Sequence, residues 1–200
     1  MNTAELNKRA LIFRDASFLS TLRQTSARKS DDLADSQMEP YAFDSQYASS
    51  IIGCLDFDAV KLALYPPAQG TMTPCSADAL MFEHNGTFLI EFKFLKAEIE
   101  NITRKAYDSV MLMIEHGGYT FAQSRKEISY LVVSTGIVNR MDDKHRALWR
   151  GLAYCKEPWK KFRNSDDHWK VASLEGVIVK EAYCMHPATF DYYVKLKCWI

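Results

Sequence analysis

Two neighbouring stretches of the chain are apolar at almost every position, and this pattern predicts two strands buried on both faces. They span residues 76–83 and 87–95, and apart from Glu83 at the end of the first stretch the charges inside them are Asp78, Glu91 and Lys93. Between the stretches lies Asn85-Gly86, a residue pair typical of a type I′ turn because both residues tolerate positive φ angles. The sequence therefore predicts a tight β-hairpin.

The predicted turn also sets the register of the hairpin. With Asn85 and Gly86 as the loop residues, Asp78 faces Lys93. Because side chains alternate across a sheet with period two, Asp78, Glu91 and Lys93 project from one face, with Asp78 diagonal to Glu91. The other face is predicted to be a core surface made of Ala77, Ala79, Met81, Ile90, Phe92 and Phe94.

The three charges are a candidate site. Strands that are apolar on both sides usually lie inside a sheet covered by helices, where isolated charges are rare unless they are paired or functional. Two carboxylates and an ammonium at this spacing suit a hard divalent cation with a cationic group beside the same water. A plain cross-strand ion pair between Asp78 and Lys93, with Glu91 reaching water, is the alternative.

The same residues resemble the motif of the PD-(D/E)XK nuclease superfamily, an acid on one strand followed by acid-any-Lys on the next. Asp78 matches the first acid, and Glu91-Phe92-Lys93 matches the second part. Ala77 stands where the motif has proline, a variation that the superfamily tolerates. The resemblance covers residues 76–136 and implies a restriction-endonuclease-like core.

The resemblance implies a metal-dependent nuclease that hydrolyses phosphodiester bonds, with DNA favoured over RNA as the substrate. Asp78, Glu91 and the carbonyl of Phe92 would bind Mg²⁺, or Mn²⁺ in its place. Lys93 would orient the attacking water, help to deprotonate it, or stabilise the pentavalent oxygens. Some members supply a further acid from an upstream helix, and Glu39 and Asp58 are the candidates here.

Two rival functions stay open on the sequence. The superfamily contains members without activity, so the chain is alternatively a nuclease-like fold that acts as a protein-binding, immunity or regulatory module. Such a module would dock a partner through its N-terminal helix or through residues 156–170. A toxin or defence nuclease that cuts RNA would share the site and differ only in substrate.

The rest of the chain predicts one α/β domain with a mixed central β-sheet flanked by helices. It comprises an N-terminal helix and polar connection (1–40), a catalytic core (58–136) and a C-terminal elaboration (137–200). Hydrophobic periodicity and turn residues predict the individual elements. Helices are expected at 3–23, 96–116, 141–154 and from Pro187, with a second helix within 40–53; strands are expected at 58–65 and 128–134, and a strand pair at 171–183 turning at Glu175-Gly176.

Four basic residues are candidate nucleic-acid contacts. Lys105 borders the apolar stripe of helix 96–116, where it meets either a phosphate or, as a snorkelling lysine, only solvent. Lys160, Lys161 and Arg163 are interleaved with aromatic residues, a pattern that suits phosphates and unstacked bases but also a solvated loop.

Composition limits the partners and the compartment. The formal net charge is zero, which argues against a strong non-specific nucleic-acid binder. Five cysteines without a Cys-x-x-Cys pair are typical of reduced thiols, and no membrane-spanning stretch is present, so a cytoplasmic location is expected. A homodimer is in keeping with nucleases of this type that cut duplexes.

Overall fold

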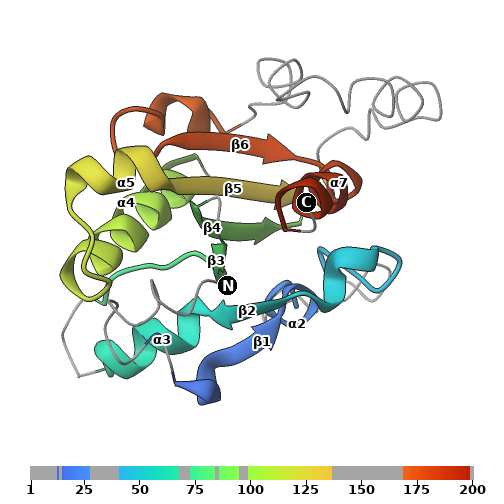
Figure 1. The fold of residues 1–200 in the computed structure, drawn as a ribbon, viewed down its shortest axis with the longest axis horizontal. Helices are drawn as coiled ribbons and strands as arrows, with labels where there is room; N and C mark the ends of the chain where they lie inside the picture. The colour runs from blue at the N-terminus through green and yellow to red at the C-terminus, as the bar shows by residue number, and fades with distance from the viewer. Residues whose placement is uncertain are drawn as a thin grey trace.

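A mixed six-stranded sheet with strand order β1-β2-β3-β4-β5-β6 forms the centre of the protein (Figure 1). The computed structural model describes residues 13, 15–27, 41–67, 73–83, 86–94, 99–136 and 169–198. Neighbouring strands from β1 to β4 are antiparallel, whereas β4, β5 and β6 are parallel. The strands are β1 Leu19–Thr21, β2 Gly53–Asp56, β3 Ala79–Glu83, β4 Gly86–Lys93, β5 Ile128–Ser134 and β6 Glu181–Met185.

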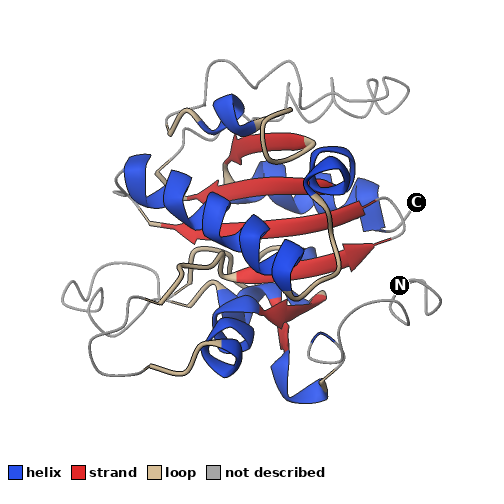
Figure 2. Ribbon diagram, turned by 90° about the vertical axis from the view of Figure 1, so that its left-hand side faces the viewer, coloured by secondary structure: helices blue, strands red, loops and turns tan. Residues whose placement is uncertain are grey.

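Helices cover both faces of this sheet, which confirms the predicted fold class. The longest, α4, lies across one face and, followed by α5, connects the parallel strands β4 and β5 (Figure 2). The C-terminal helix α7 packs on the opposite face. The helices are α2 Leu22–Thr25, α3 Phe57–Leu64, α4 Ile99–Glu115, α5 Phe121–Glu127 and α7 Pro187–Cys198, with 3-10 turns η2 Ala16–Phe18, η4 Ala48–Ile51 and η6 Val171–Leu174.

Two hydrophobic cores lie on the two faces because side chains alternate along each strand. On the α4 face, Leu80, Leu89 and Tyr130 pack with helix residues that include Ile102 and Ala106. The α7 face holds most of the apolar set predicted from the sequence, including Ala79, Met81, Ile90 and Phe92, packed with Phe190 and Tyr193 of α7. Ala77 was predicted on this face but packs on the α4 face, because it precedes β3 and its amide bonds to Ser109 of α4. β6 and α7 thus belong to the central sheet and its core.

The hairpin forms, but its register differs from the predicted one by two residues. Glu83 pairs with Gly86, and Leu80 pairs with Leu89 rather than with Glu91. Gly86 therefore belongs to β4 and not to the turn. A glycine is required there because its φ is 140° and an added Cβ would lie 2.7 Å from the carbonyl oxygen of Glu127. A shift of two residues keeps every side chain of the two paired strands on its predicted face.

Replacing Gly86 by alanine should destabilise the protein more than replacing Gly118. Both glycines have positive φ, but an added Cβ at Gly118 would meet nothing within 4 Å. Strain alone costs roughly 1–3 kcal/mol at such a position, so Gly118→Ala measures strain and Gly86→Ala measures strain together with the clash. We expect Gly86→Ala to lower the free energy of unfolding in urea by at least about 1 kcal/mol more. Equal losses would contradict the close approach of β4 to Glu127.

Several predicted elements are wrong in type. Residues 58–65 were expected as a strand but lie mostly in α3, because the Asp56 carboxylate caps the helix by accepting a hydrogen bond from the amide of Ala59 at 2.9 Å. Residues 15–25 form η2, β1 and α2 in place of one helix, since Thr21 and Gln24 start α2 with a capping box.

Two further predicted elements are wrong, and two others are confirmed. Between residues 41 and 53 only the η4 turn is helical, and residues 171–183 form η6, a single bridge and the start of β6 instead of a strand pair. The predicted strand 128–134 coincides with β5, and Pro187 begins α7 as expected. The expected helix 141–154 lies outside the described residues.

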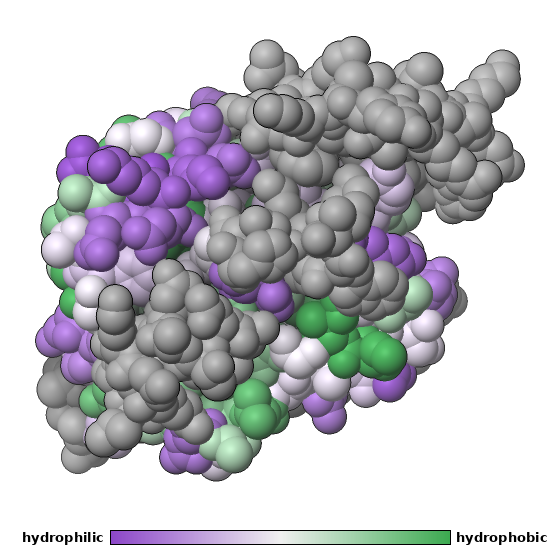
Figure 3. Space-filling model, viewed as in Figure 1, coloured by the Kyte–Doolittle hydropathy of each residue, from purple (hydrophilic) through white to green (hydrophobic). Residues whose placement is uncertain are grey.

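The surface over α4 and α5 is largely hydrophilic in the view of Figure 3. None of the helices in the described part of the chain has the length and apolar character needed to cross a membrane.

Candidate functional site: a buried carboxylate pair under helix α4

Asp78 lies immediately before β3 and is held by two backbone contacts. Its carbonyl oxygen accepts a hydrogen bond from the amide of Phe57 at the start of α3, at 3.1 Å. Its carboxylate oxygen Oδ2 accepts from the amide of Phe92 in β4, at 2.7 Å. The Asp78 carboxylate thus accepts a hydrogen bond that a backbone carbonyl would accept if β3 paired with β4 over more residues. These two bonds fix Asp78 between β3, β4 and α3.

Glu91 is the most deeply buried charge of the site. Its side chain is 0% exposed, and in β4 it pairs with Val132 of β5. Two ammonium groups contact the same oxygen, Oε1: Nζ of Lys93 at 2.5 Å and Nζ of Lys105 at 2.7 Å. The second oxygen, Oε2, is buried and has no hydrogen-bond partner among the described residues. A buried carboxylate oxygen without a partner is costly, so its presence calls for an explanation other than stability.

Lys105 links the two carboxylates. It projects from α4, and its Nζ lies 2.7 Å from Glu91 Oε1 and 3.3 Å from Asp78 Oδ1. Only 11% of its side chain is exposed. The two carboxylates are therefore close enough to share one cation, and in this structure that cation is an ammonium.

The local electrostatics follow from burial and from the two like charges. Burial, with the Glu91 carboxylate beside it, raises the pKa of Asp78 to about 7. Burial lowers the pKa of Lys105, but the carboxylates of Glu91 and Asp78 more than offset this and leave it raised. The pKa of Tyr130 is raised well above its ordinary value, first by burial and then by Glu91 and Asp78. Strong perturbation of neighbouring groups is frequent at functional sites.

Helix α4 is tied to the segment that carries Asp78. The hydroxyl of Ser109 accepts a hydrogen bond from the amide of Ala77, and the carboxylate of Asp108 accepts one from the amide of Cys75, both at 2.8 Å. The hydroxyl of Tyr130 donates to the carbonyl of Ile102 at 3.3 Å, which ties the helix to β5. These bonds hold the helix backbone in place above the carboxylates.

Asp58 is a third acid near the pair. It lies in the first turn of α3, where it accepts from Ser76 Oγ at 2.5 Å and pairs with Lys61 at 3.1 Å. Its charge also contributes to the raised pKa of Lys105. Within the described residues, no three His, Cys, Asp or Glu side chains come together as a metal-binding group.

The sequence correctly placed Asp78, Glu91 and Lys93 on one face, but it missed the partner that joins them. Asp78 was expected opposite Lys93, whereas its ion pair is with Lys105. The sequence alone predicts Lys105 only as a phosphate contact or a snorkelling lysine. The available signal was its position beside the buried stripe of α4, between Ile102 and Ser109. Lys160, Lys161 and Arg163 lie outside the described residues, as does Glu39.

A separate surface cavity of about 420 Å³ lies along α4. Arg104 lines it together with the acids Asp108 and Glu115 and with Tyr65, whose hydroxyl donates to Glu115 at 2.6 Å. Because acidic and basic side chains both line it, the cavity is not a favourable binding site for a phosphate backbone.

Comparisons of the chain with protein-family models, curated proteins and solved structures gave no significant match. Function is therefore inferred from the chemistry of the site and from the resemblance of its motif.

Proposed function

We propose that the chain is a metal-dependent nuclease of the PD-(D/E)XK type that hydrolyses phosphodiester bonds, with DNA as the preferred substrate. The observation that carries this proposal is the Glu91 carboxylate, which is completely buried beside Asp78 and has one oxygen that no described residue hydrogen-bonds. A stability role alone accounts poorly for that oxygen, because replacing buried ion pairs by apolar residues is often neutral or stabilising.

The residues fit a hard divalent cation. Asp78 and Glu91 supply carboxylate oxygens that already meet one shared cation, the ammonium of Lys105. In a strand, the amide and the carbonyl of one residue point to the same edge, and the amide of Phe92 points to Asp78. Its carbonyl therefore lies on the Asp78 side. Mg²⁺ commonly uses one or two carboxylates and keeps several waters, which is the ligand set offered here.

The chemistry that a bound divalent cation supplies is neutralisation of phosphate charge and a lower pKa for water. The protein contributes the rest. Asp78 is fixed by the amide of Phe92 and Glu91 by the sheet, so the carboxylates need no reorganisation when the cation binds. Lys93 holds an ammonium against Glu91, where it orients water, assists deprotonation or stabilises developing negative charge on phosphate.

One observation favours the rival function, a nuclease-like module without activity. Glu91 and Asp78 are compensated by Lys93 and Lys105, so the cluster is balanced in charge without any metal. Such a module would bind a protein partner. A cytoplasmic location belongs to either proposal, in keeping with reduced thiols at Cys54 and Cys75.

Cleavage assays on the purified protein test the nuclease proposal. We expect plasmid DNA, and RNA more slowly, to be cut with Mg²⁺ or Mn²⁺ and to remain intact with EDTA. Asp78→Asn should lower the DNA cleavage rate by about 10²-fold or more, because it removes one charged ligand. Asp44→Asn is the matched control, since the Asp44 carboxylate pairs with Arg23 at a separate place. Absence of cleavage by a folded wild-type protein on DNA and RNA with both metals would favour the binding module.

A further inference from the structure

The two lysines of the site occupy different positions. Among the described residues, the ammonium of Lys93 forms an ion pair with Glu91 and with no other carboxylate, and 19% of its side chain is exposed. Lys105 contacts both Glu91 and Asp78, and 11% of its side chain is exposed. Its ammonium therefore occupies the place where one cation meets both carboxylates. A divalent cation that binds the same oxygens has to displace this ammonium, because two cations in one place would repel each other at short range in a poorly hydrated environment.

The fold allows that exchange to occur by movement of the side chain alone. The backbone of α4 is fixed to the Asp78 segment through Ser109 and Asp108, and to β5 through Tyr130. The lysine stem, in contrast, is a flexible four-carbon chain that carries a compact charge. Loss of the ammonium from a completely buried Glu91 would be strongly unfavourable unless another cation took its place. Exchange of one cation for another keeps the carboxylates compensated throughout.

We propose that Lys105 is a built-in counter-ion that occupies the cation position between Asp78 and Glu91 and is displaced when a divalent metal binds. The inference rests on the proposed nuclease function and deepens it, since it assigns the regulation of metal binding to one residue. Lys105 weakens the affinity of the site for metal and keeps the buried carboxylates stable while the metal is absent. It acts on the carboxylates and is a positioning residue rather than a catalytic one.

Calorimetric titration with Mg²⁺ and with Mn²⁺ tests the exchange directly. Lys105→Gln should bind metal about tenfold more tightly than the wild type, within the usual range of coupling free energies between two ligands. Lys195→Gln is the matched control, because Lys195 likewise pairs with a carboxylate, that of Asp191 on α7. This substitution should leave metal affinity unchanged. Glu91→Gln should abolish binding in either background, which shows that the heat comes from this site.

A second measurement needs no substitution of Lys105 and covers the case in which that variant does not fold. In the wild type, Mg²⁺ should increase the rate at which Lys105 is acetylated by a reagent, followed by mass spectrometry, because the displaced ammonium leaves its carboxylate partners. The acetylation rate of Lys195 should not change. In Glu91→Gln, Mg²⁺ should have no effect on Lys105.

The outcomes separate this inference from the proposed function. Metal binding by Lys105→Gln that is equal to or weaker than that of the wild type would overturn the exchange and leave the nuclease proposal intact. The same holds if the wild type binds metal through Glu91 but Mg²⁺ does not change the acetylation rate of Lys105. No binding dependent on Glu91 in either protein would overturn both. Tighter binding together with metal-enhanced acetylation supports the exchange, whatever the substrate.

Discussion

Glu91→Gln is expected to lower the rate of metal-dependent DNA cleavage by at least about 10²-fold while changing the free energy of unfolding by no more than about 1 kcal/mol. The large loss of activity follows from the proposed role, because the amide removes the charge that would hold the cation. The small change in stability follows from the structure. Glu91 carries a buried charge, and one of its oxygens has no hydrogen-bond partner in the described part of the chain, so the substitution also removes an unfavourable contribution to the free energy of folding.

The two lysines that lose the Glu91 carboxylate in Glu91→Gln have other places for their ammonium groups. Lys105 keeps Asp78 as a partner, and Lys93 is 19% exposed, so its long stem allows the ammonium to reach water. A purely structural ion cluster would behave differently. Removal of one partner from a buried pair generally costs about 3–5 kcal/mol. Urea unfolding measured beside the cleavage rate thus distinguishes a site kept for function from one kept for stability.

Glu83→Gln serves as the control for Glu91→Gln. Glu83 lies at the other end of the same hairpin, pairs with Gly86 and is only partly buried. Its substitution makes the same chemical change in the same pair of strands but away from the carboxylate pair, so cleavage and stability should both be preserved. A loss of about 3 kcal/mol or more in Glu91→Gln would contradict the functional interpretation of the unpaired oxygen.

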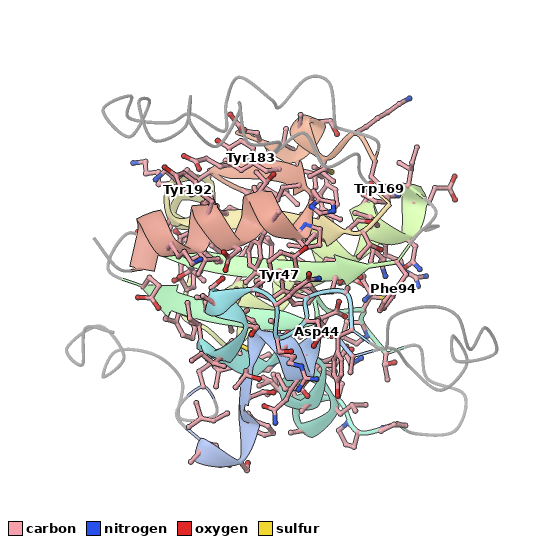
Figure 4. All side chains as sticks on the ribbon, turned by 90° about the vertical axis from the view of Figure 1, so that its right-hand side faces the viewer. Asp44, Tyr47, Phe94, Trp169, Tyr183 and Tyr192 are labelled. Atoms are coloured by element: carbon pink, nitrogen blue, oxygen red, sulfur yellow. The ribbon has the colours of Figure 1, made fainter. Side chains whose placement is uncertain are left out.

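Phe43→Ala is expected to lower the free energy of unfolding by about 3–5 kcal/mol, the usual range for a large aromatic residue in a core. Phe43 is 0% exposed. Its ring stacks on Tyr47 with centroids 4.9 Å apart, meets Phe190 of α7 edge-on at 5.1 Å and lies 6.1 Å from Phe92 of β4. It therefore joins the segment 41–47 to α7 and to the central strand. In the view of Figure 4, Tyr47 of this segment lies next to α7, whereas Asp44 lies farther from that helix.

Phe121→Ala is the control for Phe43→Ala, because Phe121 begins α5 with 44% of its surface exposed and should change stability by less than about 0.5 kcal/mol. Urea unfolding midpoints compare the two variants. The Phe43 cluster lies on the α7 face of the sheet, whereas Asp78 and Glu91 project to the α4 face. Metal affinity of the folded fraction should consequently stay unchanged in Phe43→Ala. A loss below about 1 kcal/mol would contradict the packing of segment 41–47 on the sheet.

Local sequence patterns predicted those features that depend on neighbours along the chain. The strand at Ile128–Ser134 was predictable because seven successive positions suit a buried strand, and α4 because its apolar stripe is long. The hairpin was predictable as an element, but its register was not. The Asn85-Gly86 pair pointed to a turn, whereas Gly86 is required in the strand by the approach of Glu127.

Short segments were predicted less well, because a few residues fit more than one structure. Residues 58–65 are a short, largely apolar run closed by Pro66-Pro67, which suits a strand, yet the capping of α3 by Asp56 favours a helix. That difference matters for the site. It is the start of α3 that binds the carbonyl of Asp78 through Phe57 and brings Asp58 near Lys105.

The sequence by itself determined that Asp78, Glu91 and Lys93 share one face of a buried hairpin, because side chains alternate along strands and a register shift of two residues leaves the faces unchanged. Only the tertiary structure decided how these charges are compensated. Lys105 stands 14 residues beyond Glu91 and reaches the carboxylates because α4 crosses the sheet above them. No periodicity within a strand or a helix carries that information, since it depends on how one element packs across another.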